Sequence, residues 1–232
     1  MLVEIWSDVA CPWCWVGKRR FETALAAFPH RDDVEVVWRS FELDPTSPRE
    51  VGGDPVDHLA RKYGMTRQQA DQRVDQLTEV GKAEGLDLRL RDLRRGSTFD
   101  AHRLLHLAAA HGRQDELKER LFRAYFAESL PIGDVANLSR LAVEAGLPAG
   151  EVDEVLAGDR FAEEVRADEA TAAAFGAQAV PFFVFDRTYG VQGAQAPEVF
   201  SNVFEKAWAE LHPVLLEAAP AADGCDDGAC AI

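Results

Sequence analysis

The chain has 232 residues, a hydrophobic content of 47%, a charged content of 28% and a formal net charge of −15 at pH 7. These values are ordinary for one large or two small globular domains in water, and the acidic excess argues against binding to nucleic acid or anionic membranes. No apolar run reaches the roughly 20 residues of a membrane-spanning helix, and no signal-peptide pattern precedes the first strand, so we expect a cytoplasmic protein.

The first forty residues predict a strand, a helix and a second strand. Residues 2–7 and 34–40 are rich in β-branched and aromatic side chains, which favour strands. Between them, residues 13–28 carry apolar side chains at helical spacing, namely Val16, Phe21, Leu25 and Phe28.

Residues 44–158 predict helices only, over 66–84, 97–112, 114–129, 134–145 and 151–157. Thr66 and Gln69 form a capping-box pattern at the start of the first of these helices. After the block come a helix at 160–175, short strands at 181–186 and 189–192, and a helix at 196–216. The order indicates an α/β protein with a thioredoxin fold that is interrupted by an all-helical domain.

We therefore predict four parts. Residues 1–43 and 159–217 form the two halves of the thioredoxin fold, and residues 44–158 form the helical insertion. Residues 218–232, rich in Ala, Asp and Gly, form a flexible tail.

The motif Cys11-Pro12-Trp13-Cys14 directly follows the first strand and opens the first helix. Two cysteines at this spacing can close a small disulfide, and a helix N-terminus favours a thiolate. We expect an exposed, acidic Cys11 as the nucleophile and a less exposed Cys14 as the resolving thiol. A buried pair or half of a zinc site is the alternative, but no second CxxC or paired-histidine motif follows at zinc spacing, so no metal is predicted.

The chain resembles the DsbA-like thioredoxin superfamily and, within it, the FrnE-like cytoplasmic dithiol oxidoreductases, which are related to the 2-hydroxychromene-2-carboxylate isomerase family. The segments that carry the resemblance are SDVACPWCWVG at 7–17, DAHRL at 100–104, LFRAYF at 121–126, GAQAVPFF at 176–183 and GAQ at 193–195. Those isomerases typically have serine where this chain has Cys11, so the two cysteines favour disulfide chemistry.

The resemblance implies a cis peptide bond between Val180 and Pro181, placed beside the two cysteines. It also implies that Val180 offers backbone hydrogen bonds to an extended substrate. The residues predicted to contact substrate are Pro12, Trp13, Val180 and Pro181. The expected partners are proteins with thiols or disulfides. No bound cofactor is expected, with glutathione as a candidate co-substrate.

Several other residues have a functional and a structural interpretation. Asp8 either tunes the thiols or is an exposed loop acid, and His102 and Arg103 either face the active site or have structural roles, which are commoner for a lone helical histidine. The aromatic side chains that either line a substrate groove or belong to the core are Trp15, Phe182 and Phe183.

Cys225 and Cys230 form a CxxxxC pair in the acidic tail. Some FrnE-like proteins carry such a pair, and the resemblance implies a second redox pair that exchanges with Cys11 and Cys14. The alternatives are a soft-metal or zinc site with nearby aspartates and two unlinked cysteines.

The sequence thus predicts a thiol–disulfide oxidoreductase or isomerase. The alternatives are a glutathione-dependent isomerase or transferase and a redox-regulated, chaperone-like binding protein. In a reducing cytosol, reduction or isomerisation under oxidative stress is the expected direction.

Overall fold

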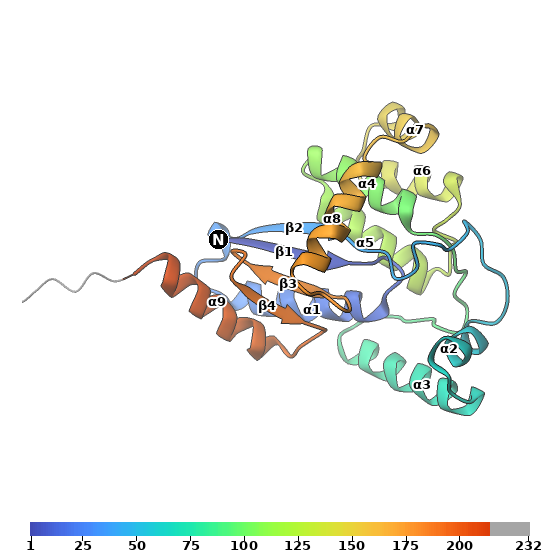
Figure 1. Cartoon of the computed structure of the whole chain (residues 1–232), viewed down its shortest axis with the longest axis horizontal. Coiled ribbons are helices and arrows are strands. Elements are labelled where there is room, and N and C mark those ends of the chain that lie inside the picture. Colours follow the sequence, from blue (N-terminus) through green and yellow to red (C-terminus); the bar gives the residue numbers. More distant parts are fainter. Residues whose placement is uncertain (214–232) are drawn as a thin grey trace, which may run out of the picture.

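A four-stranded mixed sheet forms the centre of the computed structural model, which describes residues 1–213 (Figure 1). The strand order is β2-β1-β3-β4. The strands are β1 (Leu2–Ser7), β2 (Glu35–Ser40), β3 (Phe182–Phe185) and β4 (Tyr189–Gln192). β1 runs parallel to β2 and antiparallel to β3, and β4 runs antiparallel to β3. The predicted α/β thioredoxin-type order is confirmed.

Helices α1 (Pro12–Ala27) and α9 (Pro197–Leu211) pack together beside the sheet. Phe21 of α1 lies 5.8 Å from Phe200 of α9, and Phe28 lies 5.0 Å from Phe204, measured between ring centroids. This order of contacts shows that the two helices run in the same direction, so α9 ends near the C-terminal end of α1. Phe183 and Phe185 of β3 complete this aromatic core.

Helix α8 (Ala162–Ala174) packs against β2 and α4. Its Asp168 joins two strands, because the carbonyl oxygen accepts a hydrogen bond from Trp6 Nε1 at 2.8 Å and the carboxylate accepts one from the Ser40 N–H at 2.9 Å. Trp6 is completely buried beneath this helix.

The block between β2 and α8 is helical, as predicted. It contains α2 (Pro55–Tyr63), α3 (Arg67–Ala83), α4 (Phe99–Ala110), α5 (Gln114–Phe122) with a π-helical turn at Arg123–Ala127, α6 (Val135–Glu144) and α7 (Ala149–Ala157). The capping box at Thr66 and Gln69 is present. Helix α2 is absent from the predicted set, although its N-cap Asp54 followed by Pro55 is a common helix start.

The outer edge of β2 is closed by a side chain of the helical block. Gln114, at the start of α5, accepts a hydrogen bond from the Trp38 N–H and donates one to the Trp38 carbonyl oxygen, both at 2.9 Å. The side-chain amide thus takes the place of a peptide group of a further strand. Within residues 1–213, none of the helices combines the length and the apolar character needed to cross a bilayer.

Candidate active site

The two cysteines of the CPWC motif lie where β1 ends and α1 begins. Cys11 is the N-cap residue of α1, and Pro12 occupies the first turn, where no N–H is needed. The Cys11 N–H donates to the Asp8 carbonyl oxygen at 3.1 Å, which holds the connecting turn. Cys11 and Cys14 are both free thiols, while Trp13 is 43% exposed beside them.

The cis-proline loop lies against the first cysteine. The Val180–Pro181 peptide bond is cis, as expected from the family resemblance. Cys11 Sγ lies 3.6 Å from the Val180 carbonyl oxygen, within reach of an S–H···O contact. Gly17 allows this approach, because a Cβ atom there would lie 2.8 Å from Pro181 Cγ. The structure therefore brings Cys11, Cys14, Val180 and Pro181 together.

The expectation of an exposed, acidic Cys11 is wrong. Cys11 is only 5% exposed and Cys14 is fully buried. A hydrogen bond with Cys14, burial and the nearby charges of Cys14 and Asp8 raise the pKa of the Cys11 thiol well above its ordinary value. The Cys14 N–H at the helix start opposes this rise but does not outweigh it.

Asp8 is buried and has several hydrogen-bond partners, so it is not an exposed loop acid. Its carboxylate accepts hydrogen bonds from the Ala10 N–H at 3.2 Å and the Leu43 N–H at 2.8 Å, and it faces His102 Nε2 at 3.4 Å. Burial raises the pKa of Asp8, but the bond and charge of His102 and the two N–H donors leave it below its ordinary value. The site therefore keeps a fixed negative charge beside the dithiol.

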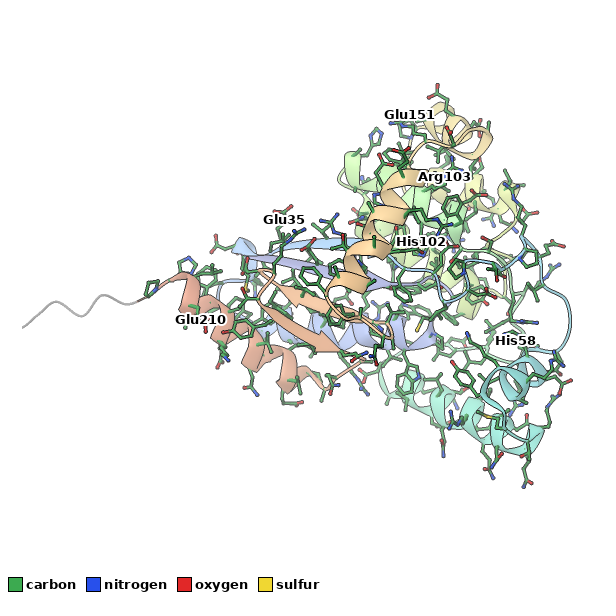
Figure 2. The ribbon with its side chains drawn as sticks, viewed as in Figure 1. Glu35, His58, His102, Arg103, Glu151 and Glu210 are labelled. Atoms are coloured by element: carbon green, nitrogen blue, oxygen red, sulfur yellow. The ribbon has the colours of Figure 1, made fainter. Side chains whose placement is uncertain are left out.

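His102 and Arg103 are successive residues of α4, and their side chains have different roles (Figure 2). His102 is completely buried against Asp8, and burial lowers its pKa. Its Nδ1 has no hydrogen-bond partner among the described residues. Arg103 instead donates to the carbonyl oxygens of Val155, Gly158 and Arg160 around the end of α7, which is a structural role.

Lys118 on α5 is a further charged group near the dithiol that the sequence interpretation missed. Its side chain is completely buried, and its Nζ donates to the Ser7 carbonyl oxygen at 3.1 Å. The signal was present, because Lys118 lies between Leu117 and Leu121 on the apolar face of a predicted helix. A lysine at such a position is seldom buried without a reason.

The aromatic residues proposed as groove or core belong to the core. Phe182 and Phe183 lie in β3, and Trp15 is 3% exposed and stacks on Phe122 and Phe126. A hollow of about 340 Å³ lies beside Trp15, between α1, the 85–89 segment and the end of α5.

Residues 1–213 contain no group of three or more His, Cys, Asp or Glu side chains arranged to hold a metal ion. Cys225 and Cys230 lie outside the described residues.

A family model described as a DsbA-like thioredoxin domain matches residues 2–205. The chain is similar to a solved structure of a probable DsbA oxidoreductase from Streptomyces coelicolor, with 52% identity and a TM-score of 0.87 over 99% of this chain and 100% of that one. It is also 30% identical to the uncharacterised protein YwbO from Bacillus subtilis, over 86% of this chain and 94% of that protein.

The fold also matches the cytosolic disulfide reductase DsbM from Pseudomonas aeruginosa, solved with GSH. That match has a TM-score of 0.63 and 17% identity, and it covers 90% of this chain and 99% of that one. At this identity the likeness concerns the fold alone.

Proposed function

This chain belongs to the family of DsbA-like thioredoxin domains, and we propose that it is a thiol–disulfide oxidoreductase that exchanges disulfides through Cys11 and Cys14. The observation that carries the proposal is the free dithiol at the start of α1, with Cys11 Sγ 3.6 Å from the carbonyl oxygen of Val180 in the cis-proline loop. A substrate segment that lies along this loop would bring its disulfide to Cys11.

In the proposed reaction, the Cys11 thiolate attacks one sulfur of a substrate disulfide. One substrate sulfur leaves as a thiolate and takes a proton from water, and a mixed disulfide remains on Cys11. Cys14 then attacks the Cys11 sulfur, closes the Cys11–Cys14 disulfide and releases the second substrate thiolate. The substrate gains two electrons and the protein dithiol loses them.

The environment of Cys11 supports the reducing or isomerising direction. Strongly oxidising disulfide oxidoreductases stabilise the cysteine thiolate of their reduced form. Here the hydrogen bond with Cys14, burial and the Asp8 charge raise the pKa of Cys11, so the reduced form gains little from thiolate stabilisation. A pair without this thiolate stabilisation is a weaker oxidant.

Insulin reduction with dithiothreitol as the electron source tests the proposal. We expect the wild-type protein to accelerate insulin precipitation, and we expect Cys11→Ser to abolish the acceleration. Cys14→Ser should accumulate a mixed disulfide that gel mobility under non-reducing conditions detects. Equal activity of the wild type and Cys11→Ser would reject the proposal.

We propose disulfide- and thiol-containing proteins as the substrates, with contacts to Pro12, Trp13, Val180 and Pro181. The exposed indole of Trp13 beside the buried dithiol supports this choice, because an apolar surface at this point can hold an unfolded segment. Trp13→Ala should raise the KM for insulin and leave reaction with a small disulfide nearly unchanged.

Cys225 and Cys230 are proposed as a second redox pair that exchanges with the first. Helix α9 ends near the C-terminal end of α1, and the dithiol lies at the other end of α1, about 25 Å away for a helix of this length. From Pro213 to Cys225 an extended chain spans up to roughly 40 Å, so the distance permits exchange. A shift in the reduction potential of Cys11–Cys14 on truncation after Ala219 would support the coupling.

Glutathione is proposed as a thiol co-substrate that reduces the Cys11–Cys14 disulfide, and the cytoplasm as the location. A neighbour with the same fold is described as a cytosolic reductase with GSH, which supports both choices. Turnover of 2-hydroxychromene-2-carboxylate with glutathione, without insulin reduction, would instead favour the isomerase alternative. Suppression of client aggregation by Cys11→Ser, Cys14→Ser would favour the chaperone-like alternative.

A further inference from the structure

Two lysines are buried in the described part of the chain, and only one of them has carboxylate partners. Lys18 on α1 is 2% exposed and lies 3.1 Å from Asp115 and 3.4 Å from Glu119. Lys118 on α5 is completely buried, and no carboxylate of residues 1–213 lies within ion-pair distance of its Nζ. The hydrogen bond to the Ser7 carbonyl oxygen is the one hydrogen bond of this amine in that part of the chain.

Two aromatic rings also lie near the Lys118 amine. Its Nζ lies 5.4 Å from the Trp38 ring centroid and 5.2 Å from that of Phe122. Burial of a cation with so few partners is unfavourable. A neutral amide could donate the same hydrogen bond to the Ser7 carbonyl oxygen with a smaller desolvation penalty. The two rings give the ammonium group cation–π contacts, but no carboxylate of residues 1–213 pairs with its charge.

The titratable groups whose charges act on Lys118 come from three elements. Cys11 and Cys14 lie at the start of α1, Asp8 follows β1, and Lys18 and His102 approach from α1 and α4. Burial lowers the pKa of Lys118 to about 8, and the negative charge that opposes this most strongly is that of Cys14, followed by those of Asp8 and Cys11. At neutral pH the amine is therefore still mostly protonated.

Asp8 is not an adequate counter-ion for this ammonium group. Its carboxylate is already occupied by the Ala10 and Leu43 N–H groups and by His102. The remaining anion that can form at this place is a thiolate, and it forms only during turnover. Cys14 is fully buried, so a thiolate there needs such a partner more than one on Cys11, which is 5% exposed.

We propose that Lys118 is a positioning residue for disulfide exchange, whose buried ammonium group stabilises the thiolate of Cys14 for attack on the mixed disulfide. The inference rests on the function proposed above. In this step the Cys14 proton passes to solvent, and the thiolate forms beside the ammonium group of Lys118. The thiolate attacks Cys11 Sγ, the Cys11–Cys14 bond forms, and the substrate sulfur leaves with the electron pair of the broken bond. Once the disulfide is closed, Lys118 has lost its anion, and its protonation becomes less favourable.

The aromatic disulfide DTNB separates the two chemical steps, because each step releases one coloured thiolate. The first release reports attack by Cys11 and the second reports attack by Cys14. The full-length chain with Cys225→Ser and Cys230→Ser serves as the parent, so that tail thiols add no signal. We expect Lys118→Met to leave the first release nearly unchanged and to slow the second about ten-fold or more at neutral pH, because the attacking thiolate loses the nearby ammonium charge.

The pH profile distinguishes this role from a structural one. In Lys118→Met the profile of the second release should move to higher pH, and Lys118→Arg, which keeps the charge, should restore most of the parent profile. Lys18→Met is the control for burial, and we expect it to lower stability because its carboxylates lose their partner, with no slowing of the second release.

Several outcomes would overturn the inference. One is a second release in Lys118→Met with the rate and pH profile of the parent. Another is a Lys118→Met variant that lacks the native near-ultraviolet circular dichroism while Lys118→Arg also fails to restore the profile, since Lys118 would then be structural. Absence of the first release in the parent would instead reject the proposed oxidoreductase function.

Discussion

The Asp8 carboxylate and the His102 imidazole lie 3.4 Å apart, and both side chains are buried. Asp8 follows the last residue of β1, whereas His102 lies on α4 of the helical insertion. The contact therefore joins the turn that carries the CPWC motif to a helix that is about ninety residues away in sequence. The turn before the dithiol is therefore held in part by the packing of the insertion.

Asp8→Asn removes the fixed negative charge beside the dithiol. We expect the pKa of the Cys11 thiol to fall, because the Asp8 charge is one of the contributions that raise it. Ultraviolet absorbance of the thiolate during a pH titration measures this. The exposed Asp87→Asn serves as a control that should not move the titration. A Cys11 titration at the same or a higher pH in Asp8→Asn would contradict the expectation.

His102 should make the folded protein sensitive to mild acid. Burial lowers its pKa in the folded state below the unfolded value near 6.5, so the unfolded chain binds a proton first as the pH falls. The stability that the neutral imidazole contributes is present above about pH 6.5 and decreases below it, by up to about 1.4 kcal/mol per pH unit. Urea denaturation between pH 7 and about 5 should show a flatter pH dependence for His102→Gln than for the wild type. Parallel curves would mean that His102 is not the group responsible.

Gly17→Ala should separate α1 from the cis-proline loop. The added Cβ would lie 2.8 Å from Pro181 Cγ, so one of the two elements must move. Overpacking of this kind costs about 1–3 kcal/mol, which the helix preference of alanine offsets by about 1 kcal/mol. We expect a small loss of stability in urea and a larger loss of insulin reductase activity. Gly150→Ala on α7 is the matched control, because nothing lies within 4 Å of its added Cβ.

Gln114→Leu should destabilise the edge of the sheet. The N–H and carbonyl groups of Trp38 lose their partner in this variant, which costs about 1–3 kcal/mol when such groups stay buried. Gln72→Leu on the exposed face of α3 provides a control that should unfold at the wild-type urea concentration. If both variants unfold like the wild type, the side-chain amide does not support β2.

The sequence predicted the elements whose signals are local. The strand at 189–192 has the predicted bounds, and the capping box at Thr66 marks the start of α3 correctly. The CPWC motif could be placed at a helix start because it contains Pro12, which suits a first helical turn, and because a strand ends shortly before it. The fold order followed from these local patterns.

The burial of the site could not be predicted in the same way. Cys11 is covered by Val180 from a loop far along the chain, and Asp8 is enclosed by Leu43 and His102. The same residue types are compatible with an exposed loop when these distant contacts are unknown. Lys118 is an exception, because its place on an apolar helix face can be read from the sequence.

The Gln114 amide on the edge of β2 ties the helical block to the sheet. Gln114 occupies the position of a missing fifth strand, and Lys118, one turn later on the same helix, holds the carbonyl oxygen that ends β1. A thioredoxin-like half freed of residues 44–158 would expose an unpaired strand, which is prone to pair with other copies. The helical block thus completes one edge of the sheet. We expect the block and the sheet to unfold in a single transition.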